Sequence, residues 1–216
     1  MRKALIAGAT GAIGSILLKY LNESDQYSEI HCIGRREPPI LGEKIKVHVV
    51  NYDELHQFDL PPPIDDVFCT LGTTLKAAGS IEAFKKVDRD YVHQVGKLAK
   101  RHNAKTFSVV SAIDADAGSS NCYNQTKGEA EELLQCLDLH SLRIFRPSLL
   151  HGTREKFRLT EAIGFGALTI MRPLLQGPWK KYRSISTGQV AKAMYASARQ
   201  DYGPVQIFES DEIQGF

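Results

Sequence analysis

Three residues in the middle of the chain have types and a spacing that suit acid–base chemistry. Tyr123 and Lys127 stand four residues apart, so on a helix they share one face. A phenol with a pKa near ~10 is a poor acid–base group at neutral pH, but an ammonium within about 4–6 Å favours phenolate. Ser111 precedes Tyr123 by twelve residues and could hydrogen-bond a substrate oxygen. We predict Ser111, Tyr123 and Lys127 as a catalytic trio.

A glycine-rich turn near the N-terminus is typical of a phosphate site. Its three glycines have G-x-x-G-x-x-G spacing and lie between an apolar run and a helical pattern. Glycine lets the chain turn tightly, lets backbone amides approach a phosphate and lets the helix pack on the strand. The turn therefore predicts a site for the pyrophosphate of a dinucleotide at a helix N-terminus, the alternative being a structural turn without a ligand. The residues assigned to it are Gly8, Thr10, Gly11, Ala12, Ile13 and Gly14.

Two arginines bear on which dinucleotide is bound. Arg35 and Arg36 come at the end of the second predicted strand, where a fold selective for NAD usually has an acidic residue for the ribose 2′-hydroxyl. Arginine instead forms charge-assisted, often bidentate bonds to a 2′-phosphate. We expect NADP rather than NAD as the cofactor; the alternative is that the pair belongs to a solvated loop.

The elements that must position these residues alternate along the chain. Short apolar runs predict strands over residues 4–7, 29–33, 45–50, 67–70, 106–110, 142–145 and 205–208. Helical spacing marks residues 13–21, 84–98 and 130–137, and Thr187 looks like the N-cap of a last helix. Such alternation predicts an α/β fold, a doubly wound parallel sheet of Rossmann type, with ligands beyond the carboxyl ends of the strands. Residues 1–216 form one domain, with 153–181 as a small substrate-side cap.

Composition narrows the class of protein. The 216 residues are 43% hydrophobic and 24% charged with a net charge of +2, as in a soluble globular protein, which argues against nucleic acid and membrane partners. The four cysteines and seven histidines show no metal-ligand spacing, so we expect no metal. No apolar run suits a signal peptide or a membrane span. We expect a cytoplasmic protein that acts on a small molecule, and the long helices could pair two copies as a homodimer.

These motifs together resemble the short-chain dehydrogenase/reductase superfamily. Three further segments, at 67–74, 87–91 and 127–129, are similar to the Tat-interacting-protein group of its atypical members, and residues 145–147 add to the match. The resemblance covers residues 1 to about 150. It implies an NADP(H)-binding fold with reductase chemistry on a carbonyl or hydroxyl group. It also implies that Lys127 touches the nicotinamide ribose, and it adds these cofactor residues: Thr70, Leu71, Gly72 and Pro147.

Two positions depart from the pattern of the superfamily. Asp88 stands where many relatives have the asparagine of a catalytic tetrad, which leaves the proton-relay water in doubt. Asn51 stands where relatives often have an aspartate for the adenine amine, and its amide could still serve. Because function resides in the site rather than the fold, two hypotheses stay open. One is an NADP(H)-dependent oxidoreductase, and the other is a non-enzymatic NADP(H)-binding regulator or scaffold.

Overall fold

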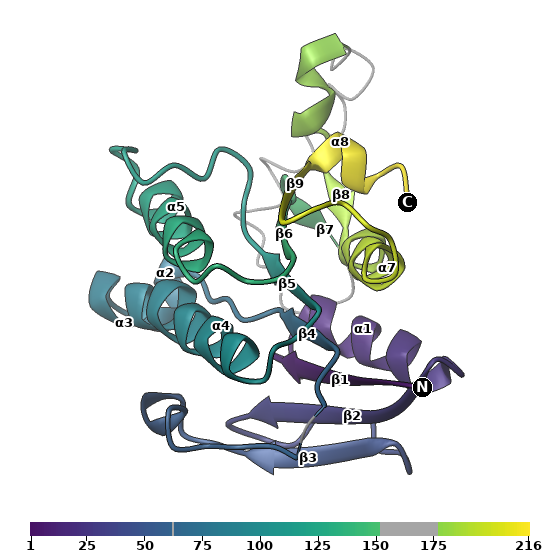
Figure 1. Ribbon diagram of the computed structural model, residues 1–216. Helices are drawn as coiled ribbons and strands as arrows, with labels where there is room; N and C mark the ends of the chain where they lie inside the picture. Colours follow the sequence, from purple (N-terminus) through teal and green to yellow (C-terminus); the bar gives the residue numbers. More distant parts are fainter. Residues whose placement is uncertain (62, 152–176) are drawn as a thin grey trace.

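A seven-stranded parallel sheet forms the centre of the computed structural model, which describes residues 1–61, 63–151 and 177–216 (Figure 1). The strand order is β3-β2-β1-β4-β5-β6-β9, and every neighbouring pair is parallel. This confirms the predicted doubly wound α/β fold. The strands are β1 (Arg2–Ala7), β2 (Tyr27–Gly34), β3 (Ile45–Val49), β4 (Asp66–Cys69), β5 (Thr106–Val110), β6 (Leu142–Arg146) and β9 (Val205–Glu209).

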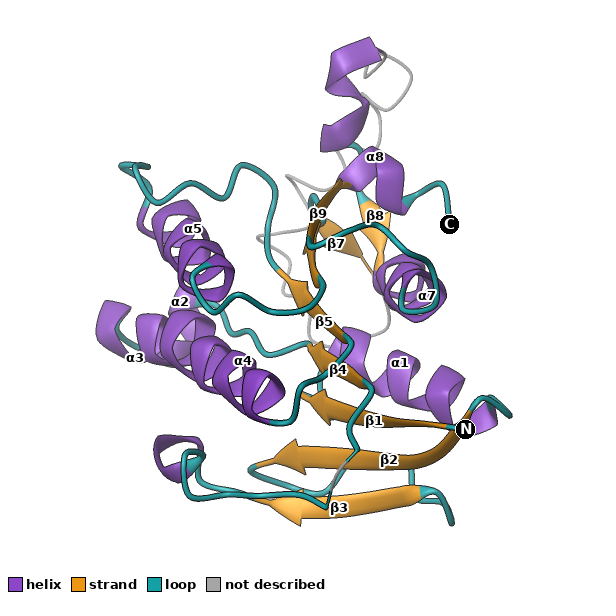
Figure 2. Ribbon diagram, viewed as in Figure 1, coloured by secondary structure: helices purple, strands orange, loops and turns teal. Residues whose placement is uncertain are grey.

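Helices cover both faces of the sheet (Figure 2). Alternate side chains of β1 pack into opposite layers: Ala4 and Ile6 join the core beneath α1 and α7, whereas Leu5 and Ala7 join the core beneath α4 and α5. Burial on both faces explains why the strands read as continuous apolar runs rather than alternating ones. The helices are α1 (Ala12–Glu23), α2 (Leu75–Ala78), α3 (Ile81–Lys85), α4 (Val92–Arg101), α5 (Cys122–Gln135), α7 (Thr187–Ser197) and α8 (Ser210–Ile213).

The helix predicted over 84–98 is not one regular helix. The π-helical segment η2 (Lys86–Tyr91) separates α3 from α4. A π turn adds a residue to the helical repeat and rotates the side chains that follow it, which a search for 3.6-residue periodicity does not detect. The segment brings Asp88 into the interior, where the residue is 1% exposed.

The last predicted N-cap is wrong by one residue. Ser186, not Thr187, caps α7: its hydroxyl accepts from the Gln189 backbone N–H at 3.1 Å, and the Gln189 side chain accepts from the Ser186 N–H at 3.1 Å. Thr187 is the first residue of the helix. This reciprocal pair is a capping box, and it starts the helix that covers β1 from the α1 side.

Only the end of the predicted cap falls within the described residues. Residues 153–176 of the expected 153–181 segment lie outside them, while η3 (Gly177–Tyr182) lies within. Two short strands, β7 (Leu150–His151) and β8 (Ile185–Ser186), flank the segment and pair in parallel as a separate two-stranded sheet. The domain limits and the pairing of two copies stay predictions.

Candidate active site at the carboxyl ends of the strands

The glycine turn connects β1 to α1 at the point where the strand order reverses. Gly8 has φ +91°, and a Cβ on it would lie 2.7 Å from the Thr70 Oγ1 atom. A Cβ on Gly14 would lie 2.2 Å from the Gly8 carbonyl oxygen, so α1 packs against the turn with no room for a side chain. The Gly11 N–H donates to the same oxygen at 2.8 Å. The turn therefore needs glycine for both its backbone conformation and its close packing.

A cavity of about 450 Å³ lies beside this turn, within the size range of small-molecule sites. No aspartate or glutamate is among the described residues that line it. Tyr52 adds a wall that the sequence did not suggest: its ring stacks on Tyr91 at 5.1 Å and its hydroxyl donates to the Ile33 carbonyl oxygen at 3.1 Å. The predicted cofactor residues in the lining are Gly8, Thr10, Gly11, Arg35, Arg36, Thr70, Leu71 and Gly72.

Several predicted cofactor residues lie outside this lining. Ile13 and Gly14 are buried in the packing of α1, and Ala12 is the first residue of that helix. The Asn51 side-chain oxygen accepts from the Asp53 N–H at 3.1 Å and caps the short helix η1 (Tyr52–Glu54). Pro147 is buried after β6, where its carbonyl oxygen accepts from the Ile113 N–H at 3.0 Å. Their predicted contacts with a dinucleotide stay predictions.

Lys127 is paired with a carboxylate inside the protein. Its Nζ atom lies 2.7 Å from Oδ1 of Asp88, with the two side chains 6% and 1% exposed. The other Asp88 oxygen accepts from the Thr73 backbone N–H at 2.8 Å, in the loop that follows β4 and lines the cavity. Burial alone would lower the pKa of Lys127, but the Asp88 carboxylate outweighs it and holds that pKa above its ordinary value. Lys127 is therefore a fixed cation.

Tyr123 stands one turn before Lys127 on α5, as its spacing predicts. Its ring stacks on Phe84 of α3 at a centroid distance of 5.5 Å. The helix begins there because the Asn121 side-chain oxygen accepts from the backbone N–H groups of Tyr123 and Asn124. Across the helix, a Cβ on Gly128 would lie 2.1 Å from the Ala117 nitrogen, so the chain between β5 and α5 rests directly on the helix.

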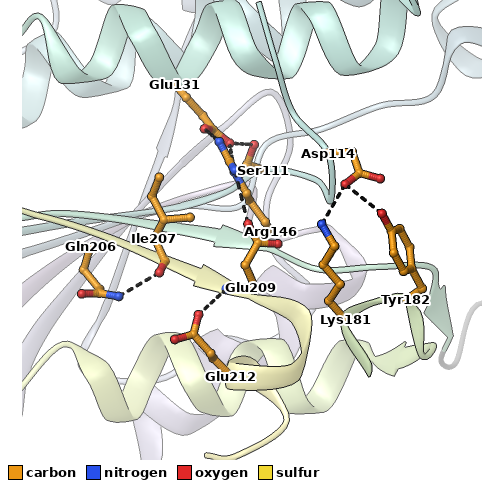
Figure 3. Close-up of polar contacts among 10 residues, drawn as sticks. All are labelled: Ser111, Asp114, Glu131, Arg146, Lys181, Tyr182, Gln206, Ile207, Glu209 and Glu212. Carbon is orange, nitrogen blue, oxygen red and sulfur yellow. Dashed lines mark hydrogen bonds and ion pairs between the residues drawn. The ribbon is translucent and has the colours of Figure 1, made fainter. Parts of the chain in front are cut away.

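Ser111 is buried, and its hydroxyl donates to the Glu131 carboxylate rather than to Tyr123 (Figure 3). Glu131 is 3% exposed and accepts from Arg146 Nη2 at 2.6 Å and from Arg146 Nε at 3.1 Å. Arg146 also lies 3.3 Å from a Glu209 oxygen. Ser111, Lys127, Asp88 and Glu131 share the wall of a cavity of about 10 Å³. The structure thus brings Ser111 close to Lys127 while its hydroxyl hydrogen bond goes to Glu131.

Two buried carboxylates, Glu131 and Asp88, therefore belong to the candidate site. Neither of them was assigned a contact there from the sequence. Glu131 follows Lys127 by four residues, so helical spacing placed it on the same face as Tyr123 and Lys127. That spacing was the available signal for Glu131. For Asp88 the resemblance marked the position, but only the folded chain shows that its partner is Lys127.

The comparisons with known proteins agree with this geometry. A family model described as "NAD dependent epimerase/dehydratase family" matches residues 4–211. Protein FMP52, mitochondrial, of Eremothecium gossypii is 32% identical over 218 residues, which cover 97% of this chain and 95% of the relative. Protein HTATIP2 of Rattus norvegicus is 36% identical over 174 residues, covering 77% of this chain and 72% of the relative. These matches confirm the resemblance seen in the sequence.

Solved structures show the same fold at low sequence identity. MoeE5 in complex with UDP-glucose and NAD has a TM-score of 0.69 at 14% identity, covering 96% of this chain and 76% of that one. WbmH of Bordetella bronchiseptica in complex with NAD⁺ has a TM-score of 0.71 at 18% identity, covering 97% and 76%. At such identities the likeness establishes the fold alone.

The expected cytoplasmic location is wrong. Fungal relatives carry mitochondrial names, including FMP52 of Eremothecium gossypii and FMP52-2 of Scheffersomyces stipitis, which is 34% identical over 171 residues. The prediction rested on composition and on four cysteines without a characteristic spacing, which do not distinguish one reducing compartment from another. None of the described helices is long and apolar enough to cross a membrane.

By the extent of the family match and the identity of these relatives, the chain belongs to the NAD-dependent epimerase/dehydratase family.

Proposed function

We propose that this protein is an NADP(H)-dependent oxidoreductase that transfers a hydride to or from a small carbonyl or hydroxyl substrate. The observation that carries the proposal is that the glycine-turn cavity adjoins Lys127, which lies on α5 one turn from Tyr123. A Cβ on Gly72, which lines the cavity, would lie 3.8 Å from Lys127 Nζ, so the predicted dinucleotide and proton-transfer sites adjoin.

Two features of the cavity lining support the proposal of a phosphorylated dinucleotide. Gly8, Gly11 and Gly72 contribute bare backbone to this lining, and Gly11 is the N-cap of α1, whose first turn has no acidic residue. Arg35 and Arg36 are exposed and line the same cavity, so each can bind a 2′-phosphate. The NAD in the solved neighbours is the alternative. A bound nicotinamide supplies the hydride acceptor or donor that the chain itself lacks.

The proton chemistry is assigned to α5. In the direction of reduction, Tyr123 donates its phenolic proton to the substrate oxygen, and in oxidation it takes that proton back. Lys127 favours the phenolate form by its charge and binds the nicotinamide ribose. Ser111 would hydrogen-bond the substrate oxygen, which requires its hydroxyl to turn from Glu131 towards the substrate.

Two measurements test this proposal. Calorimetry at low salt should show tighter binding of NADPH than of NADH, with the difference nearly lost in an Arg35→Ala, Arg36→Ala double variant. Each charge-assisted contact is worth on the order of 1.5–3 kcal/mol. The exposed Arg199, which lies over Tyr195 and is not among the residues lining the cavity, provides the control Arg199→Ala. Equal affinities in the parent protein would refute the choice of NADP.

A substrate screen tests the reaction. Aldehydes, ketones and sugar-nucleotide-like compounds are assayed for NADPH consumption by the parent protein and by Tyr123→Phe. The variant should retain its fold and cofactor affinity, while turnover falls by about two to four orders of magnitude. Tyr20→Phe, a tyrosine on α1 that packs near Tyr195, is the matched control and should retain activity.

One observation favours the second hypothesis, a dinucleotide-binding regulator or scaffold. The Ser111 hydroxyl already has a buried carboxylate acceptor in Glu131, and Glu131 in turn is held by Arg146. A hydroxyl that donates to a carboxylate does not donate to a substrate at the same time. If the screen yields no turnover while NADPH binds and Arg35 and Arg36 set its affinity, the regulator hypothesis is the one supported.

A further inference from the structure

Asp88 connects the two parts of the candidate site. It lies on the π-helical segment between α3 and α4, and one of its oxygens is 2.7 Å from Lys127 Nζ. The other accepts from the Thr73 N–H at 2.8 Å. The chain immediately before Thr73 packs onto the pair, because a Cβ on Gly72 would lie 3.4 Å from Asp88 Oδ1. One buried carboxylate therefore contacts α5 and the loop after β4 together.

A pair placed in this way is not explained by stability alone. Taking a lysine and an aspartate out of water costs several kcal/mol per ion, and apolar residues of similar volume are often as stable. Lys127 and Asp88 are both almost fully buried, and they lie directly beneath Gly72 and Thr73, which line the dinucleotide cavity. Their geometry instead fixes where the ammonium group lies.

We propose that Asp88 is a positioning residue: it holds the Lys127 ammonium against the Gly72–Thr73 loop at the rim of the dinucleotide cavity and balances its charge there. This role rests on the proposed function, since it concerns the lysine assigned to Tyr123 and the ribose. An asparagine at this position would leave Lys127 with a full uncompensated charge. The aspartate makes the same lysine one half of a neutral pair.

The other groups around Lys127 do not replace Asp88. Tyr123 on α5 and Cys69 on β4 interact with the ammonium, and Glu131 shares a cavity wall with it. Burial raises the pKa of the Cys69 thiol to about 12, so that thiol is neutral. Glu131 is bound to Arg146 and to the Ser111 hydroxyl. Within the described part of the chain, Asp88 is the carboxylate in direct contact with Lys127.

The test is an NMR titration of Lys127 in the apoprotein, which needs neither substrate nor turnover. Lysine is labelled with ¹³C and ¹⁵N, and the Lys127 signal is assigned by its loss in Lys127→Met. In Asp88→Asn the shape and the acceptor for Thr73 remain but the charge is gone. The titration midpoint of the Lys127 ammonium should fall by at least about one pH unit. Burial lowers the pKa of Lys127, and the Asp88 charge that opposed this effect is then absent. NADPH affinity should fall with the midpoint, by roughly tenfold.

Asp90→Asn is the matched control. It removes the same charge two residues away on the same segment, where the carboxylate pairs with its neighbour Arg89 at 2.7 Å. The Lys127 midpoint should stay within a few tenths of a unit. An unchanged Lys127 midpoint in folded Asp88→Asn overturns the proposal.

A second variant covers the case in which Asp88→Asn does not fold. In Asp88→Ser a smaller neutral group replaces the carboxylate, so the Lys127 titration midpoint should again fall by about one unit; no fall in that variant overturns the proposal. The role of Asp88 and the proposed chemistry of Tyr123 can be refuted independently of each other. A Lys127 midpoint that falls as expected, with full turnover in Tyr123→Phe, keeps the role of Asp88 and removes the proposed chemistry.

Discussion

Gly128, the glycine of the helix that carries Tyr123 and Lys127, should not tolerate a side chain. A Cβ added there would lie 2.1 Å from the Ala117 nitrogen and 2.3 Å from the Asp116 carbonyl carbon. Both are backbone atoms, so no side-chain rotation relieves the contact. In Gly128→Ala, α5 and the chain at 116–117 must therefore separate by roughly 1 Å to restore ordinary packing. That movement also disturbs the Asp116 N–H bond to the Asn124 carbonyl oxygen, now 3.1 Å.

Two opposing effects determine the size of the change. Alanine is favoured over glycine inside a helix by about 1 kcal/mol. Overpacking against rigid backbone costs about 1–3 kcal/mol and occasionally more. We expect Gly128→Ala to lower the free energy of unfolding by about 1–2 kcal/mol. The distance from the new Cβ to the 116–117 backbone is too short to be relieved by a small adjustment of the chain. A shift of about 1 Å at Tyr123 and Lys127 should also reduce turnover by up to ~100-fold.

Urea unfolding measures the change in stability, and the NADPH-consumption assay measures the change in turnover. Calorimetric titration with NADPH shows whether the cofactor site is disturbed as well. Gly188→Ala is the control: it makes the same substitution in α7, where the nearest atom to the new Cβ, the Ser186 Oγ, is 3.8 Å away. That variant should be neutral or more stable by up to about 1 kcal/mol. The two variants thus have opposite expected signs. If Gly128→Ala is as stable as Gly188→Ala and binds NADPH like the parent, the close packing of α5 on the 116–117 chain is not a constraint on the site.

Three further outcomes are expected. Gly14→Ala, whose Cβ would lie 2.2 Å from the Gly8 carbonyl oxygen, should weaken NADPH binding more than tenfold in calorimetry and cost about 1–3 kcal/mol in urea unfolding. Glu131→Gln should cost about 2–3 kcal/mol in the same unfolding assay, because it removes the charge that Arg146 and the Ser111 hydroxyl contact, whereas the exposed Glu132→Gln should cost under about 0.5 kcal/mol. Burial lowers the pKa of His31 and of His48. Below about pH 6.5 the unfolded chain therefore binds more protons than the folded chain, and the free energy of unfolding falls. In the double variant His31→Gln, His48→Gln the free energy of unfolding should fall less steeply as the pH is lowered.

The parts of the fold that could be predicted are those in which local pattern and global packing agree. The inner strands β4 and β5 are buried on both faces, and each of the seven strands lies where its run predicts, within two residues at either end. The glycine turn was predictable because strand, turn and helix are contiguous in sequence. Tyr123 and Lys127 were predictable as neighbours because one turn of a helix joins them.

The parts that could not be predicted depend on contacts between distant elements. The Ser111 hydroxyl was expected to face the substrate, but its acceptor Glu131 lies on another element, and nothing in the spacing of twelve residues reveals it. The π turn at Asp88 has no signature in a 3.6-residue pattern. Asn51 is different, because its side-chain oxygen accepts from the N–H two residues later and forms a local asparagine turn. The sequence alone could have indicated that this turn uses the side chain that was assigned to adenine.

The same contacts decide which substitution can separate catalysis from binding. Lys127 and Ser111 are each bound to a buried carboxylate, so Lys127→Met takes one partner from Asp88 and Ser111→Ala takes one from Glu131. Loss of activity in either variant would therefore follow from a disturbed interior whether or not the residue acts in chemistry. Tyr123 is different, since its described partner is the Phe84 ring, which phenylalanine keeps. Tyr123→Phe removes one hydroxyl and no structural bond that the described residues show, so it alone of the three isolates the proton transfer.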